Sequence, residues 1–232
     1  MHIIKKYRVG IFLAAILIIA YFFLRLIHIL NVPIFTDEAI YTRCTQIAKQ
    51  DASWRFISLT DGKQPLFIWI NIIFMRFIHE PLLSGRIVSV LAGFLTIIGL
   101  FFICKELFKN KWISIIAIFL YIIYPFALVY DRLALYDSLV ATFYIWSVYV
   151  GIVLLRKFRL DLAFILGFVL GGGALNKSIG LYSIYLLPLN LLLFNFKAKR
   201  KWQLLGKWIL FVGIASAIAE VIYAIQIGRA HV

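Results

Sequence analysis

Apolar residues fill most of the chain in long runs, and short polar connections separate them. A helix that crosses a bilayer needs about 20 mostly apolar residues, so the pattern predicts about seven spans. We place them at Val9–Leu30, Gly85–Cys104, Trp112–Tyr130, Ser138–Leu155, Leu162–Leu175, Ile179–Phe194 and Trp202–Ile225. The predicted fold class is an all-α integral membrane protein.

The one long polar stretch, from Asn31 to Gln64, follows the first predicted span. The apolar run after it, Pro65 to Ile78, is too short to cross a bilayer and carries Trp69 and Arg76. A short apolar segment with these residues is typical of a helix that lies in the membrane interface. We therefore predict that residues 31–80 form one loop with a helical, membrane-adjacent part.

Basic residues determine the predicted orientation. Four clusters lie in the connections between spans: Lys5, Lys6 and Arg8; Lys105, Lys109 and Lys111; Arg156, Lys157 and Arg159; and Lys197, Lys199, Arg200, Lys201 and Lys207. If residues 65–78 do not cross, all four clusters lie on one side, which the positive-inside rule assigns to the cytoplasm. We therefore expect a cytoplasmic N-terminus and an outer loop at residues 31–80.

Composition supports the membrane interpretation and excludes others. The chain is 64% hydrophobic with a mean hydropathy of +0.98, which excludes a single soluble core. The net charge of +14 is explained by the cytoplasmic clusters and anionic lipid headgroups, so membrane lipids and not nucleic acid are the expected partners. Cys44 and Cys104 are predicted on opposite sides of the membrane, and neither they nor the histidines have the spacing of a metal site.

Most acidic residues fall in the predicted outer segments, and two groups of them are candidates for chemistry. Asp37 and Glu38 follow the first span; they either begin a helix, worth about 1 kcal/mol, or supply a general base. Asp137 ends a short loop that also holds Asp131 and Arg132. Asp137 either caps the next helix or acts as a base, with Arg132 as a clamp for a phosphate.

Two further segments offer cations. Lys63, in a Gly- and Pro-containing turn, is either an interface anchor or a cation for a phosphate. Gly171–Gly173 lie between two short apolar segments and are expected to end a helix. A helix beginning near Ser178, with Lys177 beside it, would then form an anion site. Alternatively, the glycines permit close helix packing or mark a transporter site.

The order of these motifs resembles the GT-C membrane glycosyltransferases, and most closely the protein O-mannosyltransferases and the lipid A aminoarabinose transferases. The resemblance rests on the segments Asp37-Glu38, Lys63-Gln64-Pro65-Leu66, Gly85-Arg86-Ile87-Val88-Ser89, Arg132 to Asp137 and Asn176-Lys177. It implies that Asp37, with Glu38 sharing the role, is the main catalytic candidate and that Asp137 is the second acid. Lys63 matches a lysine that contacts the donor phosphate, although Gln64 replaces the first of two prolines. Arg132 and Lys177 are further cations for that phosphate.

The resemblance implies an inverting glycosyltransferase that moves a sugar from a polyprenyl-phosphate donor to a lipid, glycan or protein acceptor at the outer face of the cell membrane. No cofactor is certain, and a divalent metal ion is the one candidate. We expect residues 1–226 to be the N-terminal transmembrane part of a longer enzyme, incomplete by itself. Residues 227–232 resemble a translated sequencing adapter and are expected to be an artefact.

Two other functions remain open from the sequence. A transporter or flippase of lipid-linked sugars would use a broken helix at Gly171–Lys177 and would hold functional charges in mid-membrane, where Arg25 and Glu220 are the candidates. A non-catalytic membrane scaffold would need neither a broken helix nor functional charges in mid-membrane. The transferase instead predicts functional charges gathered at the outer face.

Overall fold

The computed structural model describes residues 2–56, 63–108 and 110–228, and this part of the chain is helical with no strand. The long helices are α1 (His2–Leu26), α5 (Pro81–Phe108), α8 (Asp137–Lys157), α9 (Leu160–Asn176) and α11 (Lys201–Gly228). Shorter ones are α2 (Thr36–Gln50), α4 (Leu66–Phe74), α6 (Lys111–Ile123), α7 (Pro125–Tyr130) and α10 (Ser183–Leu186), with 3-10 turns Ile29–Asn31, Ala52–Phe56, Ser178–Tyr182 and Leu187–Leu193.

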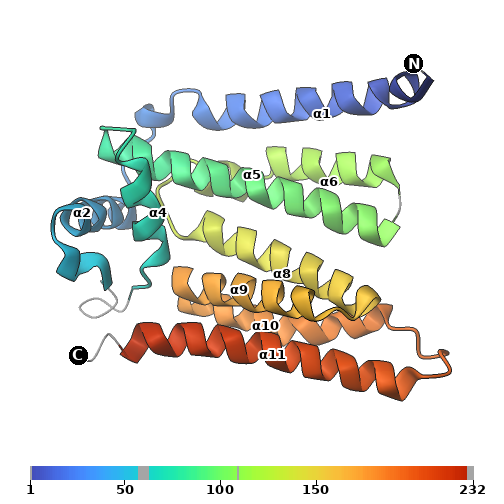
Figure 1. The fold of residues 1–232 in the computed structure, drawn as a ribbon. Coiled ribbons are helices and arrows are strands. Elements are labelled where there is room, and N and C mark those ends of the chain that lie inside the picture. Colours follow the sequence, from blue (N-terminus) through green and yellow to red (C-terminus); the bar gives the residue numbers. More distant parts are fainter. Residues whose placement is uncertain (1, 57–62, 109, 229–232) are drawn as a thin grey trace.

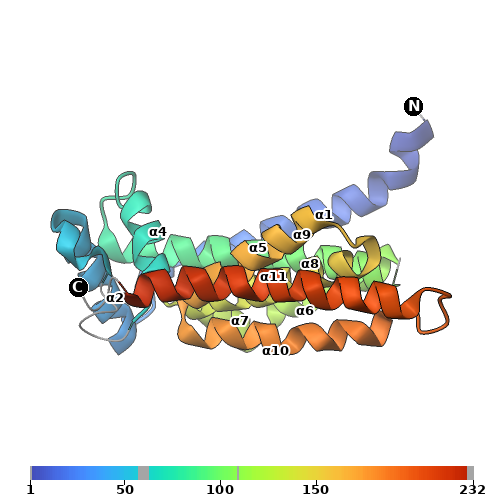
Figure 2. The ribbon, with the colours of Figure 1, turned by 60° about the horizontal axis from the view of Figure 1, so that its bottom comes forward.

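The long helices lie side by side, and the chain runs back and forth between two ends of the bundle (Figures 1 and 2). One end carries α2 and α4, and we call it the cap end. The other carries the connections between α5 and α6, α8 and α9, and α10 and α11, and we call it the basic end (Figure 1). The N-terminus also lies at the basic end (Figure 1). Each of the four basic clusters therefore belongs to a segment that begins, ends or turns at this end, with Lys109 outside the described residues.

Four helices of the described chain are long and apolar enough to cross a bilayer, namely Gly10–Asn31, Pro81–Phe108, Asp137–Lys157 and Lys201–Gln226. Three shorter apolar helical segments, Lys111–Ile123, Leu160–Asn176 and Ser178–Leu193, accompany them. The predicted all-α membrane fold is confirmed. By contrast α4, with 9 residues and about 14 Å of length, is too short to cross and lies at the cap end (Figure 1).

The predicted span Trp112–Tyr130 is wrong as a single helix. Pro125 divides it into α6 and α7, because proline has no N–H to donate and forces the residue before it out of the helical region. Tyr124 accordingly has φ −64° and ψ 120°. The break leaves the last carbonyl groups of α6 without helical partners, and this matters for the site below.

The expected helix break lies three residues later than Gly171–Gly173, because α9 continues through the glycines to Asn176; the next helical segment, a 3-10 turn, begins at Ser178 as expected. The glycines serve close packing instead. A Cβ at Gly171 would lie 2.6 Å from the Ile222 side chain of α11, and one at Gly172 would lie 2.6 Å from the Phe143 ring of α8. Small residues that let helices approach closely are common in membrane bundles.

Candidate active site at the cap end

The segment between α7 and α8 lies at the centre of the cap end. We call residues 131–137, which include the first residue of α8, the central segment. Its apolar residues Leu133 to Tyr136 are buried among Tyr41 of α2, Phe67 of α4 and Val88 of α5. Gly85 makes room for it, since a Cβ there would lie 2.6 Å from that of Ala134. The polar groups of this segment bond to helices from both halves of the chain, as described next.

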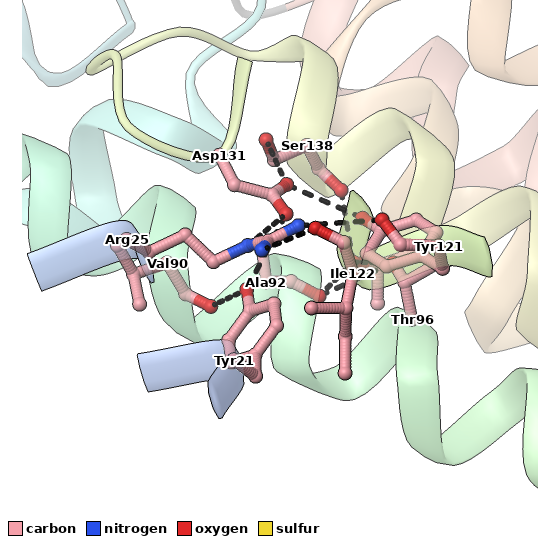
Figure 3. Close-up of polar contacts among 10 residues, drawn as sticks. Tyr21, Arg25, Val90, Ala92, Thr96, Tyr121, Ile122, Asp131 and Ser138 are labelled. Carbon is pink, nitrogen blue, oxygen red and sulfur yellow. Dashed lines mark hydrogen bonds and ion pairs between the residues drawn. The ribbon is translucent and has the colours of Figure 1, made fainter. Parts of the chain in front are cut away.

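Asp131 pairs with Arg25 of α1, and both side chains are buried (Figure 3). The guanidinium Nε lies 3.1 Å from the carboxylate, while Nη1 donates to the Ile122 carbonyl of α6 at 3.0 Å. Arg25 therefore binds the carbonyls that the Pro125 break leaves open. Ser138 donates to the same carboxylate at 3.0 Å. Burial raises the pKa of Asp131, and the positive charge of Arg25 opposes that effect.

This cluster explains two charges that the sequence left open. Arg25 lies in the first span, but it is bound where α1 meets the end of α6, and its partners form a closed structural network (Figure 3). Asp131 pairs with Arg25 and not with its neighbour Arg132. Gly93 of α5 is required here, because a Cβ would lie 2.4 Å from both the Asp131 carboxylate and the Tyr21 hydroxyl.

Glu38 forms the second buried ion pair, with Arg86 of α5. Two guanidinium atoms, Nε and Nη2, donate to its carboxylate at 2.7 Å each. The carboxylate also accepts the backbone N–H of Ala134 at 2.7 Å and that of Phe35 at 3.3 Å. Arg86 further donates to the carbonyls of Ile29 and Val32. Glu38 thus has four donors within the chain and fixes the start of α2 against α5 and the central segment.

Asp137 pairs with Lys177 at the end of α9, with 3.0 Å between Oδ1 and Nζ and both side chains about 40% exposed. Beside this pair, Asn176 donates to the Tyr136 carbonyl at 2.9 Å. Gln64 donates to the Ser178 hydroxyl, also at 2.9 Å. The residues next to Lys63 and Lys177 are therefore in direct contact, although they are 114 positions apart in the sequence.

Two amide oxygens at this place are buried without a hydrogen-bond partner among the described residues, those of Gln64 and Asn176. Buried polar atoms are normally satisfied, so each unsatisfied one needs an explanation. The hydroxyl groups of a sugar could donate hydrogen bonds to these amide oxygens. Sequence reasoning gave neither amide a role, although both stand directly beside predicted phosphate-binding lysines.

Lys63 and Asp37 lie on the same side of α2. The Lys63 ammonium is 5.2 Å from the centre of the Tyr41 ring, which meets the Tyr136 ring at 4.5 Å. Asp37 precedes Tyr41 by four residues, which places the two on one face of α2. Asp37 is exposed, and its carboxylate has no hydrogen bond or ion pair within the described ranges. Unlike Glu38, it remains available to a substrate.

Arg132 is half-buried and donates through Nη2 to the Ile27 carbonyl at 2.8 Å and to the His28 carbonyl at 3.4 Å. It therefore binds the C-terminal end of α1, where carbonyl groups lack helical partners. Its Nε is buried and has no acceptor in the part of the chain that the structure describes. The predicted contact of Arg132 with a donor phosphate stays a prediction.

The contacts connect four of the six predicted site residues, namely Glu38, Arg132, Asp137 and Lys177, through one segment, residues 131–137. Lys63 is joined to that segment through Tyr41 and Tyr136, whereas Asp37 is not joined to it by a contact among the described residues. That all six line a single cavity stays a prediction. Arg86 was quoted from the sequence without a role, although an arginine inside an apolar helix signals a buried partner. No group of three or more potential metal ligands occurs among the described residues, and no step below depends on a metal.

Three comparisons with known proteins complete the description of the site. The family described as dolichyl-phosphate-mannose-protein mannosyltransferase matches residues 62–223, which include α4 to α10, most of α11 and the Lys63, Asp137 and Lys177 segments. No curated protein and no solved structure gives a significant match.

Proposed function

The chain belongs to the dolichyl-phosphate-mannose-protein mannosyltransferase family, and on this premise we propose that it transfers a sugar from a polyprenyl-phosphate donor to an acceptor hydroxyl at the outer face of the membrane. The membrane glycosyltransferase class follows from the family. The outer face, the inverting course and the site residues are our proposal. The acceptor is a lipid, glycan or protein.

One observation carries the proposal, namely the contact of Gln64 with Ser178. It supports our proposal that the lysines beside these residues, Lys63 and Lys177, act on one donor phosphate at the end of an apolar bundle. A polyprenyl-phosphate donor needs this combination, because its tail is soluble only among apolar helices and its phosphate needs cations. Charge-assisted hydrogen bonds from preplaced cations are the expected main stabilisation of a leaving phosphate.

In the proposed reaction, the acceptor oxygen attacks the anomeric carbon of the sugar from the side opposite the phosphate. The new carbon–oxygen bond forms as the bond to the phosphate oxygen breaks, and the electron pair leaves with polyprenyl phosphate. Asp37 accepts the proton of the acceptor hydroxyl. Attack opposite the leaving group inverts the configuration of the anomeric carbon.

The other predicted residues support this centre. We assign Glu38 a positioning role, because its four donors leave it no part in proton transfer. Asp137 holds Lys177 toward the donor phosphate through their ion pair. Arg132 keeps its predicted place as a third cation through Nε.

The transporter reading keeps one of its two sequence arguments. The helical chain does break at Lys177, between α9 and the 3-10 turn Ser178–Tyr182, but Arg25 is part of a closed network with Asp131. Glu220 lies exposed on α11 and is not joined to the cap-end contacts.

The decisive experiment uses polyprenyl phosphate that carries radiolabelled mannose, incubated with membranes containing the full-length enzyme to which this chain is expected to belong. We expect release of unlabelled polyprenyl phosphate, a readout that does not depend on the identity of the acceptor, and loss of this release in Asp37→Asn. A flippase would carry the label across vesicle membranes with the sugar–phosphate bond intact. That result, or donor binding without cleavage in the unchanged protein, would overturn the proposal.

A further inference from the structure

A cavity of about 560 Å³ opens between α1, α5 and α6, far along the bundle from the cap end. This volume is within the range of about 300–1,000 Å³ typical of ligand pockets. Figure 2 shows the reason for the opening: toward its N-terminus, α1 leans away from the other helices. The walls are apolar along their length, with Ala14 and Leu17 of α1 facing Phe94 and Phe101 of α5.

The basic end of this cavity is positively charged. Lys105 of α5 and Lys111 of α6 both line it, and both are exposed. The nearest acid in sequence, Glu106, is already paired with Arg156 of α8. Neither lysine has an ion pair within residues 2–56, 63–108 and 110–228, so their charges are not neutralised by these parts of the chain.

A third feature indicates a ligand. The Ser114 side chain of α6 lines the same cavity and is fully buried, yet its hydroxyl has no hydrogen-bond partner among the described residues. A serine inside a helix usually satisfies its hydroxyl locally, for example with the carbonyl four residues earlier. The Ser114 hydroxyl thus lies without a partner from the described chain in an apolar wall, and two lysines line the same cavity. This arrangement fits a ligand that has a charged head, an apolar tail and a polar ester region between them.

We propose that this cavity binds an anionic phospholipid of the leaflet that surrounds the basic end. One acyl chain lies along the cavity, the phosphate lies between Lys105 and Lys111, and the ester region is within reach of Ser114. Basic pockets between membrane helices bind anionic headgroups in this way. The site is separate from the proposed donor site, which lies at the cap end, and does not depend on the proposed function.

Charge complementarity selects this occupant over a neutral one. An uncharged chain, such as the far end of a polyprenyl tail, would fill the apolar part but would leave both lysines without a counter-charge. Each basic side chain near an anionic surface contributes about a five-fold increase in affinity, so the two lysines together predict roughly a 30-fold preference for an anionic headgroup.

The test counts lipids retained by the purified protein in native mass spectrometry, from an equal mixture of phosphatidylglycerol and phosphatidylcholine. We expect the protein to retain phosphatidylglycerol, and Lys105→Gln/Lys111→Gln to lower that preference by roughly 30-fold. The matched control, Lys199→Gln/Lys207→Gln, removes the same charge from exposed lysines of the basic end outside the cavity, and should leave the preference unchanged.

A second variant tests the cavity itself. Ala14→Phe fills it without changing the charge, and should abolish retention of the lipid, while the melting temperature shows that the protein still folds. If Ala14→Phe left retention of phosphatidylglycerol unchanged, the lipid would be held only by charge attraction at the protein surface, and the proposal would be overturned. Retention of phosphatidylcholine or a polyprenol that is indifferent to Lys105→Gln/Lys111→Gln would also overturn it.

Discussion

Arg86 donates two hydrogen bonds of 2.7 Å to Glu38, and neither side chain is exposed to solvent. The pair joins α5 to the start of α2, and through Ala134 it also fixes the central segment of the cap end. Asp37, the neighbour of Glu38 on the same turn, is exposed. Adjacent carboxylates therefore have different surroundings, and the proposed roles differ accordingly.

The first prediction concerns Glu38→Gln. Removing one partner leaves Arg86 buried without a counter-charge, which typically costs about 3–5 kcal/mol. Thermal unfolding in detergent should show a large drop in melting temperature. The matched change is Glu106→Gln, whose pair with Arg156 is about one-third exposed and should cost about 0–1 kcal/mol. Equal effects of the two changes would contradict the structural role of Glu38.

The second prediction concerns Asp37→Asn, which keeps the size of the side chain and removes the proton acceptor. Loss of a positioned general base costs about 10²–10⁴-fold in rate. Stability should hardly change, because Asp37 is exposed. Donor cleavage and melting temperature measured on one preparation separate the two effects. If a well-folded Asp37→Asn protein were still active, Asp37 would have no role beyond the start of a helix. A simultaneous change of Glu38 would lower stability as well as rate, because Glu38 is expected to stabilise the fold, and the two effects could then not be separated.

The third prediction concerns Lys177→Gln. A hydrogen bond to a charged group contributes about 1.5–3 kcal/mol, so binding of polyprenyl phosphate should weaken by roughly 10- to 150-fold. Equilibrium binding of radiolabelled polyprenyl phosphate measures this without knowledge of the sugar. Asp137→Asn should weaken binding less, because it frees Lys177 without removing it. The control is Lys199→Gln at the basic end, and an equal loss there would argue against a specific phosphate site.

The fourth prediction concerns Gly93→Ala. The added methyl group would overlap the Asp131 carboxylate and the Tyr21 hydroxyl, so the Arg25 pair must shift, and overpacking costs about 1–3 kcal/mol or more. Gly213→Ala is the control, since nothing lies within 4 Å of its new Cβ and alanine favours a helix by about 1 kcal/mol. Melting temperatures should move in opposite directions. A neutral Gly93→Ala would mean that the cluster is loosely packed.

The fifth prediction concerns orientation. We expect the cap end outside and the basic end in the cytoplasm, because basic loops stay inside. In Cys104→Ser, an impermeant maleimide should label Cys44 of α2 in intact cells. In a protein without both native cysteines, Lys111→Cys, an exposed position of α6, should be labelled only after permeabilisation. The reverse pattern of labelling would place the proposed active site in the cytoplasm.

The sequence predicted the membrane fold well because the bilayer imposes one rule on every span, its apolar length. It failed where a local feature overrides that length. Pro125 divides an apolar run that is otherwise continuous, and the glycines of α9 stay helical because Ile222 and Phe143 pack against them. Both signals are visible in the sequence, but only the packing decides between a break and a close contact.

The site was predictable in its residue types and not in its pairings. Asp137 and Lys177 were singled out separately, but their contact depends on how α8 and α9 pack. Likewise Glu38 and Asp37 could not be told apart, because the partner of Glu38 lies 48 positions later in the chain. The catalytic and phosphate-binding roles of the six residues remain predictions for the experiments above.

The position of residues 131–137 has a consequence for biogenesis. Their partners in α1, α2 and α5 are synthesised before them, whereas Asn176 and Lys177 emerge from the ribosome about 40 residues later. Asp131 and Ala134 can therefore be bound while the chain is still being inserted, but Asp137 waits for α9. The proposed active site would thus be completed only by a late insertion step, and a nascent chain would hold its donor-binding groups apart until then.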